Sequence, residues 1–389
     1  MRSRLSLGAA LSLAMAAVPA AAQDLVLGFS TAKTGPYVSL ASANEIAVEI
    51  AVQEINDKGG VNGKKLRVVR FDTGGDPKQA ALAVRQFAED DKALAVIGPF
   101  SSSEVRVAFP AGERLSITQM SMSSSAPGLT KGFQFAFRNT TDEGVIIDQV
   151  LATLKDKKLP AATAAIAFAT DDIVSKSVGT AVLPSVFKKY GLPVQGTTDF
   201  QYNAFDLSPQ VSQLVRLNVD IVGLGSPPEA AINLAKEAKR QGLKSRIIGG
   251  ATVADPDLPA RMDGAGDGLT IGTTYFADVN DRTRAFAAEF GKRAKAANYQ
   301  RTEPNQMDAA SYDIVLLYAE AMKRANITGD AAKVADERKQ LRDALMTLKE
   351  FPGVEGPLTF NAERDMIKPI YIVEARDKKW NLLDTRMAQ

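Results

Sequence analysis

The stretch ALAVIGPFSSSE, residues 93–104, joins a short apolar run directly to three consecutive serines. The run at 93–97 predicts a buried strand, and the serines open a segment that is compatible with a helix. A second apolar run at 116–120 leads in the same way into SMSSSAP, residues 121–127. Each serine run alone favours an ordinary cap or turn. Together, at neighbouring strand ends, their hydroxyl and free N–H groups would form a nest suited to a carboxylate.

The chain before the first serine run alternates between strand and helix patterns. The order is strand 25–30, helix 40–58, strand 65–72, helix 76–91 and strand 93–97. Such alternation predicts an α/β fold with a parallel, doubly wound sheet, in which ligands bind at the carboxyl ends of the strands. The turn at 31–35 and both serine runs lie at such ends, which favours the binding hypothesis over the simple turn.

The pattern restarts after residue 142 and predicts a second parallel α/β lobe. Its strands are expected at 162–168, 194–200, 220–224 and 246–248, with helices between them, one of them at 176–190. The rest of the chain adds strands at 269–276, 357–360 and 369–376 and helices at 283–297, 307–325 and 336–348.

The composition excludes several classes of chemistry. The 389 residues include no cysteine and no histidine, which removes disulfides, thiol and histidine catalysis, and nearly every zinc or copper site. The net charge is only +2 and no basic stripe is present, so nucleic acid is not expected as a partner. We therefore expect no enzyme activity, no cofactor and no metal.

The first residues have the pattern of an export signal. Arg2 and Arg4 precede an uncharged stretch at 5–18, and three alanines at 20–22 form a small-residue cleavage site. We expect cleavage after Ala22. No later stretch is long and apolar enough to span a membrane, so the mature chain is predicted to be exported and soluble.

Several motifs together resemble one family, the leucine/isoleucine/valine-binding receptors of ABC importers, which are type I periplasmic binding proteins. The motifs are the Gly35-Pro36 loop, EINDKGGVNG at 54–63, DPKQA at 76–80, Ile97-Gly98 with the serine run, SAPGLT at 125–130, Phe137-Arg138 and, more weakly, GPLTF at 356–360. The resemblance covers nearly the whole mature chain.

This resemblance implies two Rossmann-like lobes, joined by three crossing strands, that close on a ligand. It divides the chain into a signal peptide at 1–22, a first lobe at 23–141 plus 273–355, and a second lobe at 142–272 plus 356–389. It implies a periplasmic monomer that delivers its ligand to an ABC permease in the inner membrane. In the family, residues matching Ser102, Ser123 and Ser125 hold the α-carboxylate of the ligand.

The chain also departs from the family at positions that bear on the ligand. The family's half-cystines fall on Gly75 and Ser101, so its small disulfide is absent. Its second-lobe glutamate, which pairs with the ligand ammonium, belongs to a Gly-x-Glu-Gly turn that corresponds to GGAT at 249–252. A tyrosine of the family pocket is Ile173 here, and another aromatic is Ser226. A cation taken out of water needs a counter-charge, so an ordinary α-amino acid is not the expected ligand.

We therefore predict a receptor for a small carboxylate, either an aromatic acid such as benzoate or a 2-oxo acid such as benzoylformate. The alternative is a branched-chain or other hydrophobic amino acid, with Asp171 or Asp172 receiving the ammonium. An exported sensor subunit or an enzyme on the same fold are alternatives of another class. The predicted ligand-binding residues are Leu40, Phe100, Ser102, Ser103, Ser123, Ser124, Ser125, Asp171, Ile173, Ser226, Ala251 and Met307.

Overall fold

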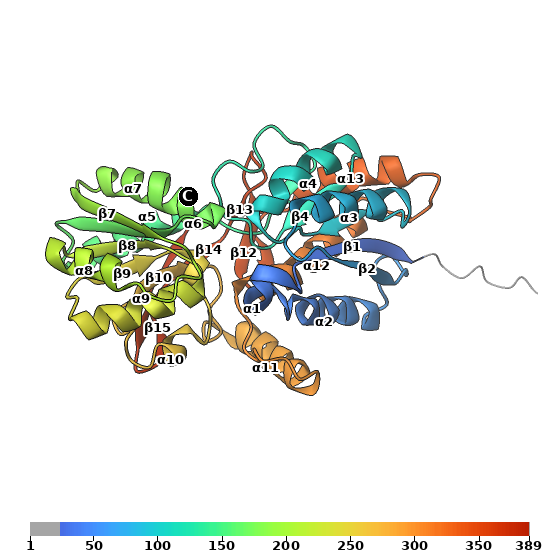
Figure 1. The fold of residues 1–389 in the computed structure, drawn as a ribbon. Coiled ribbons are helices and arrows are strands. Elements are labelled where there is room, and N and C mark those ends of the chain that lie inside the picture. Colours follow the sequence, from blue (N-terminus) through green and yellow to red (C-terminus); the bar gives the residue numbers. More distant parts are fainter. Residues whose placement is uncertain (1–23, 389) are drawn as a thin grey trace, which may run out of the picture.

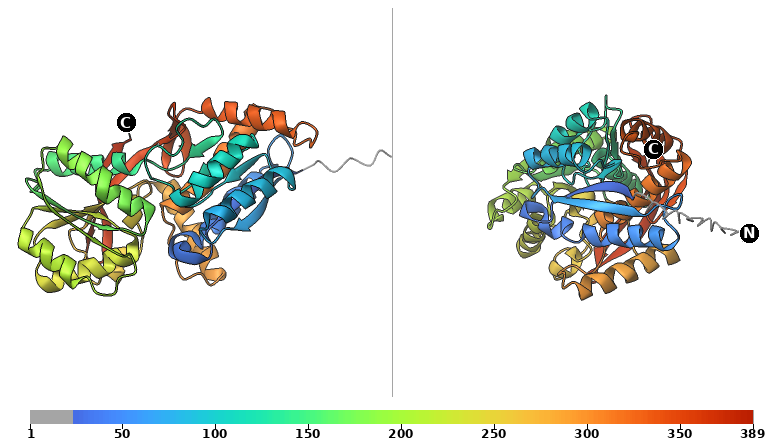
Figure 2. Two further views of the ribbon diagram at one scale, coloured as in Figure 1. Left: turned by 45° about the horizontal axis from the view of Figure 1, so that its top comes forward. Right: turned by 90° about the vertical axis from the view of Figure 1, so that its right-hand side faces the viewer.

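Two lobes, each built on its own sheet with helices on both faces, make up the molecule (Figure 1). The computed structural model describes residues 24–388. The predicted signal peptide at 1–22 therefore lies outside the described residues. A second direction of view shows the same two lobes, with the C-terminal strands beginning between them (Figure 2). Within the described residues, no helix combines the length and apolar character needed to cross a membrane.

The first sheet is entirely parallel, as the strand and helix alternation predicts. Its order is β2 (Leu66–Asp72), β1 (Leu25–Thr31), β3 (Ala95–Ile97), β4 (Thr118–Ser121) and β5 (Ala136–Arg138). The two strands that precede the serine runs, β3 and β4, are direct neighbours, with Ile97 opposite Met120. Gly98 follows β3 with a φ of +109°, and a Cβ there would collide with the carbonyl oxygen of Ser30, so only glycine fits this turn.

Helices from both ends of the chain cover the first sheet. On one face the core joins β1 to α2 (Asn44–Asp57), α11 (Asp281–Ala296), α12 (Gln306–Arg324) and α13 (Val334–Met346). On the other face α3 (Pro77–Glu89) and α4 (Ser102–Arg114) pack together over the sheet. The predicted start of α3 is confirmed, because the Asp76 side chain accepts hydrogen bonds from the N–H groups of Lys78 and Gln79.

The second sheet has seven strands and is mixed rather than wholly parallel. Its order is β15 (Lys379–Met387), β14 (Pro369–Arg376), β10 (Thr270–Thr273), β9 (Arg246–Gly249), β8 (Ile221–Gly225), β6 (Ala164–Ala169) and β7 (Val194–Phe200). Only the pairings of β14 are antiparallel. Its helices are α5 (Glu143–Asp156), α6 (Ile173–Ser177), α7 (Leu183–Lys189), α8 (Ser208–Leu217), α9 (Pro228–Gln241) and α10 (Leu258–Arg261).

Two predicted helices are interrupted in the structure. The helix expected at 40–58 is divided into α1 (Val38–Ala41) and α2, and Asn44 at the start of α2 is buried and donates to Asp308 of α12 at 2.7 Å. A tertiary contact of this kind leaves no periodic signal in the sequence. The helix expected at 176–190 becomes α6, a π-helical segment (Val178–Val182) and α7. Pro184 lacks the N–H that a regular α-helix would need there.

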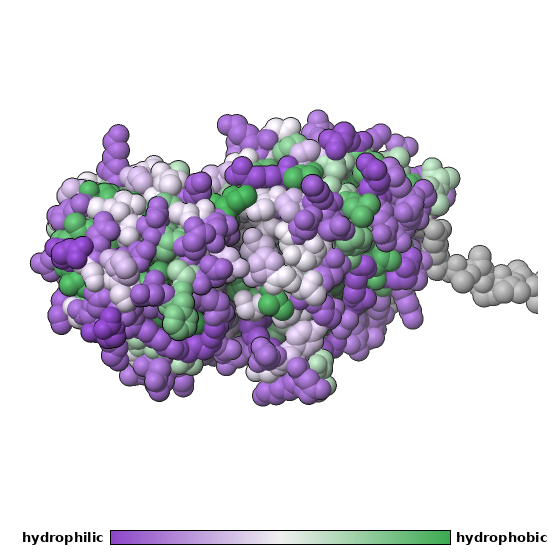
Figure 3. All heavy atoms as spheres, in the orientation of Figure 1, coloured by the Kyte–Doolittle hydropathy of each residue, from purple (hydrophilic) through white to green (hydrophobic). Residues whose placement is uncertain are grey.

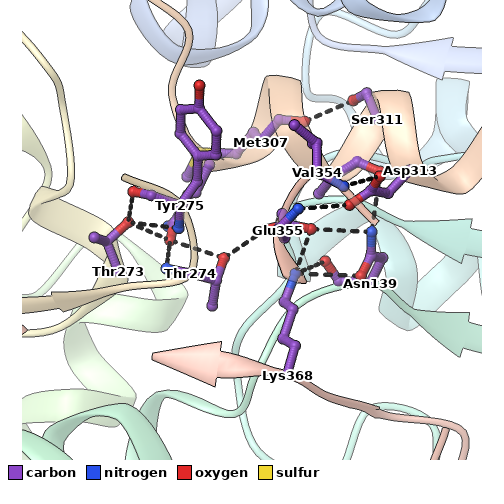
Figure 4. A network of polar contacts seen from close by, with 12 residues as sticks. Asn139, Thr273, Thr274, Tyr275, Met307, Ser311, Asp313, Val354, Glu355 and Lys368 are labelled. Atoms are coloured by element: carbon purple, nitrogen blue, oxygen red, sulfur yellow. Dashed lines mark hydrogen bonds and ion pairs between the residues drawn. The ribbon is translucent and has the colours of Figure 1, made fainter. Parts of the chain in front are cut away.

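The chain crosses between the lobes three times, and a buried polar network joins the crossings (Figure 4). The crossings follow β5, follow β10, and run through the small sheet of β11 (Phe351–Gly353), β12 (Gly356–Phe360) and β13 (Met366–Ile367). Lys368, at the last crossing, donates to Glu355 and to the carbonyl of Asn139, which lies at the first crossing. Thr274, at the second crossing, also donates to Glu355. The lobe boundaries stay a prediction, and Phe360, expected in the second lobe, packs in the same core as β1.

Candidate functional site

A cavity of about 300 Å³ lies between the lobes, at the carboxyl ends of the strands of both sheets. Figure 3 shows weakly polar and apolar side chains gathered at the hollow between two largely hydrophilic lobes. The first lobe and α12 contribute Pro36, Tyr37, Ser39, Leu40, Phe100, Ser101, Ser102, Ser103, Ser123, Ser125, Gln306 and Met307. The second lobe contributes Asp171, Asp172, Ile173, Val174, Tyr202, Pro227, Pro228, Glu229, Ala251 and Thr252.

The structure brings ten of the twelve predicted site residues together around this cavity. They are Leu40, Phe100, Ser102, Ser103, Ser123, Ser125, Asp171, Ile173, Ala251 and Met307. Ser124 and Ser226 are not part of the lining, and both are buried. The hydroxyl of Ser226 donates to the carbonyl of Pro227 at 2.8 Å, so it serves the turn before α9. The backbone N–H of Ser124 donates to the Ser121 hydroxyl at 3.1 Å, which closes the turn after β4.

The two serine runs form one connected structure. Ser101 caps α4 in a reciprocal capping box with Glu104, which leaves Ser102 and Ser103 as the first two helical residues. The Ser102 hydroxyl accepts a hydrogen bond from the N–H of Ala126, in the second run, at 3.4 Å. Hydroxyl groups and the positive end of α4 therefore face the same cavity, an arrangement that attracts an anion.

An aromatic pair forms the apolar wall beside these serines. The ring centroids of Tyr37 and Phe100 are 5.7 Å apart. Burial is the main cause that raises the pKa of Tyr37 to about 12, while the hydroxyl groups of Ser101 and Ser103 act in the lowering direction. The tyrosine is therefore neutral at physiological pH, and its hydroxyl lies close to the serine turn. Sequence analysis identified the loop at 31–35 but missed Tyr37, two residues further on.

The acidic residues of the lining already have hydrogen-bonding partners. Asp171 accepts from the N–H of Tyr202 at 2.9 Å, and Asp172 caps α6 by accepting from the N–H and hydroxyl of Ser175 at 2.8 and 2.6 Å. Glu229 forms an ion pair with Arg261. Among the described residues, no lysine or arginine lines the cavity. A bound anion would therefore be held by neutral donors and by helix ends.

Gln306, at the start of α12, is a lining residue that the sequence did not reveal. Its Oε1 accepts from the backbone N–H of Thr274 at 3.0 Å, and its Nε2 donates to the carbonyl of Ala251 at 3.1 Å. It thus ties the second-lobe turn to one of the crossings. Its neighbour Met307 was predicted as a site residue, so the start of this helix was the signal that could have indicated Gln306. The contact with Ala251 depends on how the two lobes meet, and the sequence carries no sign of it.

Comparison with known proteins gives a consistent result along most of the described chain. The sequence profile of a family described as periplasmic binding protein matches residues 24–379. The Leu/Ile/Val-binding protein homolog 3 of Brucella melitensis is 26% identical over 365 residues, with 90% of this chain and 91% of that protein covered. The Leu/Ile/Val-binding protein of Escherichia coli is 28% identical over 260 residues, with 65% and 68% covered.

Two solved structures show how similar the fold is. A branched-chain amino acid transporter substrate-binding protein from Streptococcus pneumoniae, in complex with isoleucine, superposes with a TM-score of 0.80 at 21% identity, covering 94% of this chain and 99% of that one. A solute-binding protein of an ABC transporter from R. palustris, in complex with benzoate, superposes with a TM-score of 0.78 at 19% identity, covering 93% and 96%.

Proposed function

The chain belongs to the periplasmic binding protein family and is a solute-binding receptor of an ABC transporter, and we propose that its ligand is a small carboxylate without an amine. An aromatic acid such as benzoate or a 2-oxo acid such as benzoylformate fits the cavity best. The observation that carries this proposal is the connected pair of serine turns that faces the cavity. No lysine or arginine is part of the described lining, so the neutral donors of these turns would hold the anion.

The carboxylate end of the ligand would be held by Ser102, Ser103, Ser123 and Ser125. These hydroxyl groups are neutral donors, and the first N–H groups of α4 have no partner within the helix. Ser102 and Ser125 are nearly fully buried, so hydrogen bonds to them would form away from bulk water. Hydrogen bonds to a charged acceptor are roughly twice as strong as those between neutral groups.

The apolar body of the ligand would lie between the lobes. Tyr37 and Phe100 offer ring faces from the first lobe, and Ile173 offers an aliphatic surface from the second. The volume of about 300 Å³ is at the small end of the range for ligand pockets, which suits a single ring better than a larger molecule.

The second-lobe turn offers no acidic side chain to an ammonium group, because its lining residues are Ala251 and Thr252. The specific alternative is that Asp171 or Asp172 receives the ammonium of a hydrophobic amino acid, since both line the cavity. Each of them already accepts hydrogen bonds from protein N–H groups, which favours a structural role. Solved proteins of this fold include both classes, with isoleucine in one and benzoate or 4-hydroxybenzoate in others.

A thermal-shift panel tests the ligand class. We expect benzoate, 4-hydroxybenzoate or benzoylformate to raise the melting temperature, and leucine or isoleucine to leave it unchanged. A ligand at one hundred times its Kd stabilises the folded state by about 2.7 kcal/mol, which is a shift of several degrees for a protein domain. Toluene and acetate serve as controls, because each carries only one half of the expected ligand. A strong response to leucine without any response to the acids would overturn the proposed ligand.

We also propose how the ligand is delivered to the transporter. Residues 1–22 would direct export, and the two lobes, at 23–141 plus 273–355 and at 142–272 plus 356–389, would close on the ligand and dock as a monomer on an ABC permease. A sensor role or an enzymatic role on this fold would instead require a partner kinase or turnover of the bound acid. The family and its relatives are binding proteins of transporters, which favours the receptor.

A further inference from the structure

Glu143, the first residue of α5, lies behind the wall of the cavity where the two lobes meet. Its backbone N–H donates to the carbonyl of Ser125 at 3.0 Å. The N–H of Thr252 donates to its Oε1 at 3.4 Å. Ser125 lines the cavity from the first lobe and Thr252 from the second. Glu143 thus contacts both surfaces that would hold the ligand, although it does not itself line the cavity.

The carboxyl group of Glu143 is buried without enough polar partners to offset its removal from water. Glu143 is fully buried, and among the described residues its Oε2 has no hydrogen-bonding partner. A Cβ at Gly250 would collide with its Oε1, so only a glycine there lets the carboxyl lie against the turn. Burial is the main cause that raises the pKa of Glu143 to about 7, while the Thr252 N–H and the nearby Ser125 side chain act in the lowering direction.

No cation in the surrounding segments neutralises this carboxyl. The runs at 121–126, 250–253 and 273–276 carry no charged side chain. The charged neighbour that acts on Glu143 is Asp142, which raises its pKa and lies 3.8 Å from Arg138. The elements packed against α5 carry charged residues in β9, α7 and β14, namely Arg246, Lys188, Lys189, Glu374 and Arg376. Most of these form ion pairs with other groups. The acids on the cavity side are Asp171, Asp172 and Glu229.

A carboxylate bound at Ser125 would lie near the Glu143 carboxyl, because the Glu143 N–H donates to the Ser125 carbonyl and its Oε1 accepts from Thr252, and Ser125 and Thr252 both line the cavity. Two negative charges about 6 Å apart in a partly buried site repel each other enough to change affinity by more than tenfold. The ligand and an ionised Glu143 therefore disfavour each other.

Building on the proposed carboxylate ligand, we propose that Glu143 is a positioning residue whose protonation is coupled to capture. When the ligand carboxylate reaches Ser125, the Glu143 carboxylate takes up one proton from solvent and becomes a neutral acid. Its neutral form keeps the contacts to Ser125 and Thr252 and removes the repulsion. Capture of the anion is then accompanied by net proton uptake at pH values above about 7.

Calorimetric titration tests this coupling directly. The wild type and Glu143→Gln are titrated at pH 7.5 in two buffers of different ionisation enthalpy, with whichever acid gives the largest thermal shift. We expect the wild type to take up a sizeable fraction of a proton for each ligand and the Gln variant to take up none. From pH 7 to pH 9 the wild-type affinity should fall by up to tenfold per pH unit, while the Gln variant stays flat. Asp142→Asn keeps the helix cap and removes the charge that raises the pKa of Glu143, so it should still take up a proton on binding, with its affinity profile displaced toward lower pH.

Equal proton uptake in the wild type and in Glu143→Gln would overturn the coupling. The buried acids of the crossings are unchanged in the Gln variant. Proton uptake that is lost in this variant can therefore be assigned to Glu143 and not to those acids. If leucine binds and the acids do not, the proposed ligand fails by itself. The same titration with leucine, whose carboxylate would reach the same serines, then decides the role of Glu143. If neither class binds, both proposals fail.

Discussion

Replacing Lys368 with methionine should lower the free energy of unfolding by about 3–5 kcal/mol near pH 7.5. The Lys368 ammonium is fully buried, and it donates to Glu355 Oε2 at 2.7 Å and to the Asn139 carbonyl at 2.8 Å (Figure 4). Methionine fills a similar volume but provides no charge. Glu355 and nearby Asp313 would then remain as two buried acids without the lysine between the crossings.

The loss should depend on pH. Burial raises the pKa of Glu355 to about 7 and that of Asp313 to about 6, and Lys368 acts on both in the lowering direction. Because these folded-state values lie above the ordinary ones, the stability that these acids contribute is complete below about pH 4 and is lost as the pH rises through 6 and 7. Removing Lys368 raises both values further. The variant should therefore be closest to the wild type at pH 5 and most destabilised at pH 8.

Thermal and denaturant unfolding at pH 5 and pH 8 measure this effect. Lys349→Met is a matched control, since Lys349 is exposed, and it should change the free energy of unfolding by less than about 0.5 kcal/mol. Equal unfolding free energies for Lys368→Met and the wild type at pH 8 would show that the network contributes nothing. A loss that is larger at pH 5 than at pH 8 would contradict the assigned charges.

The network also explains how the crossings are held. One lysine connects backbone and side chain of Asn139 with Glu355, and Glu355 in turn accepts from Thr274 at 2.8 Å. Asp313 of α12 accepts from the N–H groups of Val354 and Glu355 at 2.7 and 3.0 Å. The three crossings therefore share one set of buried polar contacts, and closure of the lobes would have to bend the chain around this set.

Features with a local signal could be predicted from the sequence. The strands before both serine runs, the cap at Asp76 and the parallel first sheet follow from apolar runs, from turn residues and from strict alternation. The two serine runs could be placed in one site because β3 and β4 had to be neighbours for the chain to remain doubly wound.

Features that depend on the meeting of distant segments could not be predicted. Glu143 is an ordinary acid at a helix start in the sequence, and only the approach of Gly250 makes it a buried group at the cavity wall. Lys368 and Glu355 are thirteen residues apart and show no motif. Ser226 was predicted by matching a pocket position of the family, but its hydroxyl turns back to its own chain.

Replacing Ser103 with aspartate should abolish binding of the proposed carboxylate while leaving the empty protein folded. Ser103 is the second residue of α4 and lines the cavity. A negative side chain in the first turn of a helix is stabilising by about 0.3–1 kcal/mol, so the melting temperature of the empty variant should be unchanged or raised. A ligand carboxylate about 4 Å away would be repelled by about 4 kcal/mol, roughly a thousandfold in affinity.

Ser103→Asn is the matched control, because asparagine has the shape of aspartate without its charge. We expect its affinity for the acid to lie within about tenfold of the wild type in a calorimetric titration at pH 6.5. Ser103→Asp should also gain affinity for benzylamine, in which a cation replaces the carboxylate on the same ring. If the Asp and Asn variants bind benzoate equally, the carboxylate does not lie at the start of α4. If benzylamine remains excluded while benzoate is lost, the change acts through shape rather than charge.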